Sequence, residues 1–199
     1  MVPEASLRAL ARQVLTVVDD RIEGSIVECG AWRGGVGFLL AKILDDLGTQ
    51  RRVILCDSFS GLPAPAPIDG TAAAAWSENP AGEYYFDNCS ADAEEVLSSA
   101  KRLGVSERIT LVPGWFDQTL PIHRDSFGPI AILRIDADWH ASVSVCLEQL
   151  YGQVSPGGFI VLDDYDTWEG CAIAVHEFLG NRKLPHRIAH DGCAYFRKM

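Results

Sequence analysis

Short apolar runs alternate along this chain with longer segments in which apolar residues recur at helical spacing. In one longer segment Leu39, Ile43 and Leu47 follow one another at every fourth position, as on one face of a helix. The short runs are apolar almost throughout, which is typical of strands buried on both faces of a parallel sheet. We therefore predict an α/β fold with helices on both faces of the sheet. The strands are expected at 25–30, 51–57, 108–114, 130–136 and 158–164, and the helices at 35–48, 92–105, 143–151 and 168–179.

Three segments depart from this alternation. Residues 1–24 place apolar side chains along one face and predict an N-terminal amphipathic helix. Near the C-terminus, Asp191-Gly192 separates two short strand-like runs, which is the signal for an antiparallel hairpin. Residues 63–79 are rich in Pro and Ala and have no periodic apolar face, so we predict a mobile surface loop or lid.

The size and composition are those of one soluble domain. The 199 residues suffice for one full core, so we expect a single domain over 1–199. The hydrophobic fraction of 48% against 22% charged excludes a disordered chain, and no apolar run is long enough to span a membrane. The N-terminus lacks the pattern of a signal peptide and the six cysteines include no C-x-x-C pair, so we expect a reduced, cytoplasmic protein. The net charge of -10 argues against a nucleic-acid partner and suits a bound divalent cation.

Residues at the carboxyl ends of the predicted strands indicate the ligand, because open α/β sheets bind their ligands there. Glycines follow the first strand at 30, 34, 35 and 37, a spacing that differs from the G-x-G-x-x-G loop that cradles a pyrophosphate. Glu28 in that strand would repel a phosphate and suits an ammonium group, while Asp57 is placed for the hydroxyls of a ribose. S-adenosylmethionine carries both groups and no phosphate. The alternatives are a salt bridge from Glu28 to Arg33 and a helix cap by Asp57.

Acidic residues follow two other predicted strands. Asp136 ends "ILRID", and Asp163 and Asp164 end "GFIVLDD". Neighbouring buried carboxylates require a cation, and oxygen ligands without cysteine favour Mg²⁺ or Mn²⁺. We expect these three residues to hold the cation, which lowers the pKa of a bound substrate hydroxyl, and Asp136 to take the proton. Capping of the next helix is the alternative for Asp163 and Asp164, and Asp138 faces the same side as Asp136 only if the strand continues.

Five stretches together resemble one protein family. From residue 24 to the C-terminus they are, in order, "VECGAWRGG", "CDSFSGLP", "LVPGWFDQTLP", "ILRIDADWH" and "SPGGFIVLDDY". They are similar to the successive motifs of the macrocin O-methyltransferase (TylF/MycF-type) family. The resemblance implies a Rossmann-like class I methyltransferase fold, with a seven-stranded, mostly parallel sheet in the order 3-2-1-4-5-7-6 and strand 7 antiparallel. It also implies that S-adenosylmethionine and Mg²⁺ serve to methylate a sugar hydroxyl, often on an antibiotic.

These motifs and the strand-end residues give one set of expected site residues. His140 stands where the family commonly has tyrosine, and we expect an acceptor-side group or auxiliary base there, with a surface histidine as the alternative. The N-terminal region is also shorter than in the family, and both departures concern the acceptor. The expected cofactor-binding residues are Glu28, Cys29, Gly30, Asp57, Ser58, Trp115, Phe116 and Asp136, the two aromatic residues lying where an adenine ring would stack.

The acceptor is predicted only as a class of molecule. We expect a small-molecule diol, a sugar in the first reading, and a homo-oligomeric protein. A catechol or other aromatic diol is the second reading, for which Trp139, Tyr165 and Trp168 would form a flat clamp. A non-catalytic cofactor-binding protein of the same fold is the third, and the three retained aspartates count against it.

Overall fold

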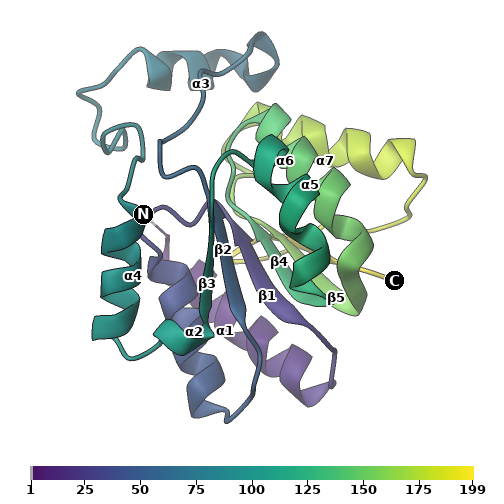
Figure 1. Cartoon of the computed structure of the whole chain (residues 1–199). Coiled ribbons are helices and arrows are strands. Elements are labelled where there is room, and N and C mark those ends of the chain that lie inside the picture. The colour runs from purple at the N-terminus through teal and green to yellow at the C-terminus, as the bar shows by residue number, and fades with distance from the viewer. Residues whose placement is uncertain (1) are drawn as a thin grey trace.

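Seven strands form one sheet in the order β3-β2-β1-β4-β5-β7-β6 in the computed structural model, which describes residues 2–199 (Figure 1). Strands β1 to β5 are parallel, and β7 runs antiparallel to both β5 and β6. This order and the antiparallel strand confirm the predicted fold class. The strands are β1 (Ser25–Cys29), β2 (Val53–Asp57), β3 (Ile109–Pro113), β4 (Ile130–Ile135), β5 (Val154–Leu162), β6 (Ala189–Asp191) and β7 (Cys193–Arg197).

Helices cover both faces of the sheet because alternate residues of each central strand enter different cores. Val27 packs with residues of α5, α6 and α7, whereas its neighbour Ile26 packs with residues of α1, α2 and α4. Figure 1 shows these two helical layers on opposite sides of the strands. The helices are α1 (Glu4–Asp19), α2 (Gly35–Asp46), α3 (Gly70–Ser77), α4 (Ala93–Arg102), α5 (Phe116–Phe127), α6 (His140–Leu150) and α7 (Glu169–Asn181), with 3-10 turns η1 (Pro67–Asp69), η2 (Ser106–Arg108) and η3 (Tyr151–Gln153).

Two helices were not predicted from the sequence. Helix α5 lies between β3 and β4 and contains Pro121. The segment 63–79, expected as a loop without regular structure, contains η1 and α3, and α3 stands apart from the two helical layers (Figure 1). We call residues 63–79 the lid segment from here on. Whether it moves stays a prediction.

The N-terminal helix packs against the hairpin of β6 and β7. Ser6 Oγ donates a hydrogen bond to Gly192 O at 2.8 Å, across 186 residues of sequence, and Arg12 forms an ion pair with Asp191 at 2.6 Å. Gly192 has φ of 75°, and a side chain there would collide with the backbone of α1. Within residues 2–199 the structure contains no helix long and apolar enough to cross a membrane.

Candidate active site

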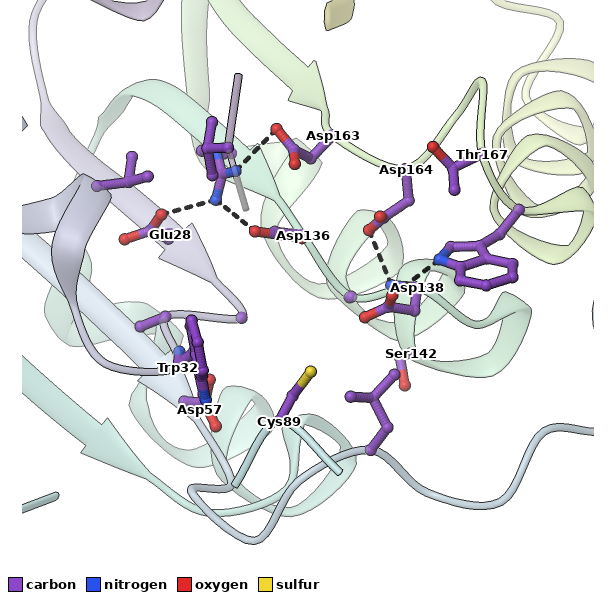
Figure 2. A pocket seen from close by; sticks show the side chains of 18 of the residues that line it. Glu28, Trp32, Asp57, Cys89, Asp136, Asp138, Ser142, Asp163, Asp164 and Thr167 are labelled. Atoms are coloured by element: carbon purple, nitrogen blue, oxygen red, sulfur yellow. Dashed lines mark hydrogen bonds and ion pairs between the residues drawn. The ribbon is translucent and has the colours of Figure 1, made fainter. Parts of the chain in front are cut away.

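A cavity of about 1320 Å³ opens at the carboxyl ends of β1, β2, β4 and β5. Figure 2 shows Asp57 on one side of it and Asp138 and Asp164 on the other. Two of the predicted site residues, Cys29 and His140, are not part of its lining. The predicted residues that do line it are Glu28, Gly30, Asp57, Ser58, Trp115, Phe116, Asp136, Asp163 and Asp164.

Asp57 ends β2 and faces the cavity. Its Oδ2 accepts the backbone N–H of Trp32 at 2.7 Å, and its Oδ1 accepts that of Phe59 at 2.6 Å. Both donors lie in loops, so the helix-cap alternative for Asp57 is wrong. Burial raises the pKa of Asp57, and the backbone hydrogen bonds offset part of the rise. A carboxylate oxygen accepts more than one hydrogen bond, so acceptor positions remain for two hydroxyls of a ligand.

The backbone after β1 lies directly against the end of β4. Gly30 has φ of 91°, and a Cβ there would overlap the carbonyl oxygen of Asp136, so glycine alone permits the approach. The side chain of Cys29 is fully buried in the core, and its expected place among the cofactor contacts stays a prediction. Trp115 and Phe116, at the start of α5, line the cavity, and stacking of an adenine ring on them stays a prediction.

The cation nearest to the strand-end carboxylates is a residue of the chain itself. Arg134 of β4 is fully buried, and the strand register places it beside Glu28 of β1. Its Nη1 lies 2.7 Å from Glu28 Oε1 and 2.8 Å from Asp136 Oδ2, and its Nη2 lies 2.7 Å from Asp163 Oδ1. Arg33, the alternative partner of Glu28, instead stacks on a tryptophan ring. Arg134 was not predicted as a site residue, although an arginine inside an apolar strand is itself a signal.

One guanidinium therefore faces three carboxylates in this buried network. Burial raises the pKa of Glu28 to about 7, against the opposing charge of Arg134. Burial by itself lowers the pKa of Arg134, but the carboxylates reverse the effect and leave it above its ordinary value. Glu28 Oε2 is buried and has no hydrogen-bond partner within residues 2–199. Such an oxygen is costly unless a ligand donates to it, which is consistent with the ammonium partner predicted for Glu28.

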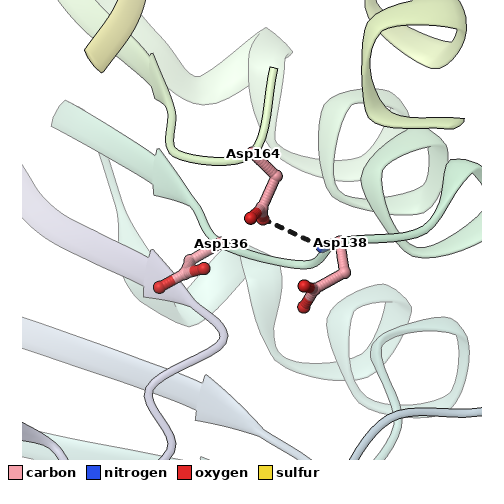
Figure 3. A group of neighbouring side chains, drawn as sticks. All are labelled: Asp136, Asp138 and Asp164. Atoms are coloured by element: carbon pink, nitrogen blue, oxygen red, sulfur yellow. Dashed lines mark hydrogen bonds between the residues drawn. The ribbon is translucent and has the colours of Figure 1, made fainter. Parts of the chain in front are cut away.

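A second group of carboxylates lies between the ends of β4 and β5. Asp136, Asp138 and Asp164 bring one oxygen each within 4.8 Å of the others (Figure 3). Asp136 and Asp164 were predicted to share a cation, but the third predicted ligand, Asp163, is directed to Arg134 and Asp138 takes its place. The reason is a turn after β4, in which the N–H of Asp138 donates to Asp164 Oδ2 at 3.0 Å. The strand β4 ends at Ile135, so the alternation of side chains along a strand does not determine where Asp138 points.

Asp138 is held by its backbone and by its side chain. Its φ of 54° is in the left-handed region, which is uncommon for a residue other than glycine and marks strain that neighbouring contacts must hold. The indole Nε1 of Trp168 donates to Asp138 Oδ1 at 2.9 Å. Trp168 also directly precedes α7, whose start has no side-chain cap, so capping is not the role of Asp163 or Asp164.

The three carboxyl groups of this second group have raised pKa values. Burial, the largest cause in each case, raises the pKa of Asp136 to about 6 and that of Asp138 to about 8. Burial and the neighbouring aspartates also raise the pKa of Asp164. A cation placed among carboxyl groups with raised pKa values would stabilise their charged forms. Because all the donor atoms here are oxygens, the group fits Mg²⁺ or Mn²⁺.

His140 is directed away from the cavity. Its Nε2 lies 2.8 Å from Glu177 Oε2, and its backbone N–H donates to Asp69 Oδ1 at 2.7 Å. The predicted role of His140 as acceptor-side group or base has no support in this geometry, because its ring contacts Glu177 of α7 and does not line the cavity.

Aromatic rings lie beside the acidic group. The ring centroid of Trp76, from α3 in the lid segment, is 5.8 Å from that of Trp139, which is 5.1 Å from that of Trp168. Trp76 and Trp168 line the cavity, whereas Trp139 is buried behind them. Tyr165, the third member of the predicted clamp, instead bonds His176 through its hydroxyl at 2.9 Å.

Residues 1–198 match the family described as macrocin O-methyltransferase (TylF). The chain is 33% identical over 186 residues to the 8-demethyl-8-(2,3-dimethoxy-alpha-L-rhamnosyl)-tetracenomycin-C 4'-O-methyltransferase of Streptomyces olivaceus, covering 92% of this chain and 69% of that protein. It is 29% identical over 190 residues to the mycinamicin III 3''-O-methyltransferase of Micromonospora griseorubida, covering 94% and 73%.

The demethyldecarbamoylnovobiocin O-methyltransferase of Streptomyces niveus is 32% identical over 174 residues, and this chain spans 64% of its length. Among solved structures, that of the O-methyltransferase NovP superposes with a TM-score of 0.84 at 29% identity, covering 98% of this chain and 80% of that one. The chain thus spans between 64% and 73% of the length of these sequence relatives.

Proposed function

Because this chain belongs to the macrocin O-methyltransferase (TylF) family, we propose that it transfers a methyl group from S-adenosylmethionine to a hydroxyl of a sugar on a natural product. The observation that carries the proposal is the placement of Asp57 and of the group Asp136, Asp138 and Asp164 in one cavity. A ribose-binding carboxylate and an acidic, acceptor-activating group within one cavity are what this reaction needs. The names of two relatives specify a rhamnosyl and a mycinamicin acceptor, which favours a sugar here too.

The cofactor half of the cavity would be formed by β1 and β2. Asp57 would accept the ribose hydroxyls, and Glu28 Oε2, which lacks a partner among the described residues, would accept from the ammonium group. When bound, S-adenosylmethionine supplies an electrophilic methyl group on sulfur. The acceptor oxygen would take this methyl group as the carbon–sulfur bond breaks, its proton would pass to an aspartate of the acidic group, and S-adenosylhomocysteine would leave.

Asp136 and Asp164 would hold a divalent cation beside Asp138, while Asp163 keeps its ion pair with Arg134. Such a cation, when bound, supplies Lewis acidity that eases ionisation of an acceptor hydroxyl. Among the aspartates, Asp138 is the better proton acceptor. Arg134 is already paired with Asp136, whereas Asp138 lies outside that ion-pair network and the indole N–H of Trp168 fixes its orientation. This replaces Asp136, the base expected from the sequence.

An aromatic diol is the second candidate acceptor. It is favoured by Trp76 and Trp168, which line the cavity beside the acidic group. These rings equally suit the apolar face of a sugar, and membership of the family favours the sugar.

The test is a methyl-transfer assay with the purified protein, S-adenosylmethionine and Mg²⁺. The acceptors are rhamnosylated natural products, their aglycones and catechols, and mass spectrometry detects the added methyl group. We expect methylation of glycosides on the sugar, lost in chelator and in Asp138→Asn. Product from catechols alone would move the assignment to the second candidate. Binding of S-adenosylhomocysteine without any methylated product would favour a non-catalytic protein.

A further inference from the structure

Asp69 is a buried carboxylate of the lid segment that lies outside the cavity lining. It ends η1 and is 3% exposed. Its Oδ1 accepts the backbone N–H of His140 at 2.7 Å, and its Oδ2 accepts that of Ala66 at 2.7 Å. One oxygen thus orders the lid segment itself, and the other ties this segment to the start of α6.

Asp69 lies beside the N-terminal ends of two helices, α6 and α7. The residues that precede α6 and α7, Trp139 and Trp168, provide no side-chain cap. Asp69 supplies the missing acceptor for α6 from a distant part of the chain, and its charge lies at the positive ends of both helix dipoles. Gly170, in the first turn of α7, allows the contact, because a Cβ there would overlap Asp69 Oδ1 and lie 3.0 Å from the N atom of His140.

These two helix starts hold Asp138 in place. Asp138 lies two residues before α6, and Trp168, directly before α7, donates to its carboxylate. A second tie runs from the lid segment to the same loop, since Trp139 Nε1 donates to the carbonyl oxygen of Pro63 at 2.9 Å. A left-handed residue persists only where its surroundings determine it, and here the lid segment supplies part of those surroundings.

We propose that Asp69 is a positioning residue, which holds Asp138 in its strained conformation by joining the lid segment to the starts of α6 and α7. The proposal rests on the proposed function for the role of Asp138 as proton acceptor. Its structural part, the dependence of the Asp138 loop on Asp69, does not. Ordering of the lid segment and placement of the Asp138 carboxylate are then coupled, so Asp138 is aligned when the lid segment is folded over the cavity.

The test compares Asp69→Ala and Asp69→Asn with Asp92→Ala. Asp92 is a matched control, because its Oδ1 caps α4 by accepting the N–H groups of Glu94 and Glu95, away from the main cavity. Hydrogen exchange of the 137–142 amides is measured without substrate. Calorimetry with S-adenosylhomocysteine and steady-state kinetics follow.

We expect Asp69→Ala to raise exchange at 137–142 and to lower kcat on the order of 10²-fold, with the affinity for S-adenosylhomocysteine unchanged. Asp69→Asn keeps one carbonyl oxygen for the N–H of His140 and should recover part of kcat. Asp92→Ala should leave exchange at 137–142 and kcat as in wild type. Gly170→Ala displaces Asp69 without altering its chemistry and should reproduce the exchange pattern, which covers the case in which Asp69→Ala does not fold.

Unchanged exchange at 137–142 in Asp69→Ala, or in Asp69→Asn and Gly170→Ala if the alanine variant is unfolded, overturns the proposal. So does a fall in kcat that Asp92→Ala matches, because general loss of helix stability would then explain it. A wild-type protein without methyl-transfer activity would count against the proposed function alone, since the exchange result still decides whether Asp69 holds the loop.

Discussion

Removal of Arg134 should destabilise the protein in a way that depends on pH. Arg134→Met keeps an unbranched apolar stem but leaves Glu28, Asp136 and Asp163 without the guanidinium that lies 2.7–2.8 Å from each. Removing one partner of a buried ion pair costs about 3–5 kcal/mol, and we expect a loss of this size at pH 8.5.

Protonation of the carboxylates that lose Arg134 limits the loss of folding stability at lower pH. Burial already raises the pKa of Glu28 to about 7, above its unfolded value of 4.5, and loss of Arg134 raises it further. A carboxyl group whose pKa is higher in the folded state binds more protons there, so its penalty is absent below the unfolded pKa and complete above the folded pKa. The loss in Arg134→Met should therefore be smallest near pH 5 and grow through pH 7 to 8.

Urea unfolding at pH 5.5, 7.0 and 8.5 measures this difference for wild type and for Arg134→Met. Arg182→Met is the control, because Arg182 pairs with Glu148 at 2.7 Å on the surface, where both side chains are more than a third exposed. That pair should contribute at most about 1 kcal/mol, with little change across this range. A loss in Arg134→Met that is equal at pH 5.5 and 8.5, or no larger than in the control, would refute the reasoning.

Three further predictions concern ligands. Asp57→Ala should weaken binding of S-adenosylhomocysteine by about 1.5–3 kcal/mol in calorimetry, and wild-type affinity in this variant would exclude the ribose role. Mg²⁺ should raise the melting temperature of wild type but not of Asp164→Asn. Without cation Asp164→Asn should melt above wild type at pH 8, because the raised pKa of Asp164 makes its ionisation costly in the folded state, and a cation response retained in Asp164→Asn would contradict its assignment as a ligand. The lid segment should gain hydrogen-exchange protection when S-adenosylhomocysteine binds, and equal protection in both states would identify a passive connector.

The sheet was predictable because its strands are buried on both faces. Apolar runs such as "VILC" contain no polar residue, as is typical of a strand covered on both faces. The segments between the runs show apolar residues at clear helical spacing. Helix α5 lacked that signal. It buries only Leu120 and Phe127, leaves Ile122 75% exposed and contains Pro121, so its sequence shows no continuous apolar face.

The sequence predicted which strand ends form the site but not how the side chains are arranged within it. The sequence located Asp57, Asp136 and Asp164 at the cavity, because strand ends of a parallel sheet meet at one edge. It could not separate Asp163 from Asp138, because that choice depends on a turn with a left-handed residue and on the reach of Arg134 from inside β4. Contacts made by backbone N–H groups between distant segments, such as that of His140 with Asp69, leave no trace in local sequence patterns.

The contact of α1 with the hairpin of β6 and β7 has a consequence for biosynthesis. The helix is translated before the hairpin, yet Ser6 and Arg12 contact Gly192 and Asp191 of that hairpin. During translation the apolar face of α1 therefore lacks part of its docking surface until the hairpin has left the ribosome. Contacts between residues so distant in sequence form late in folding, and exposed apolar surface on a nascent chain attracts chaperones. A ribosome stalled before residue 189 would carry a sheet without its last two strands and a first helix that is only partly docked.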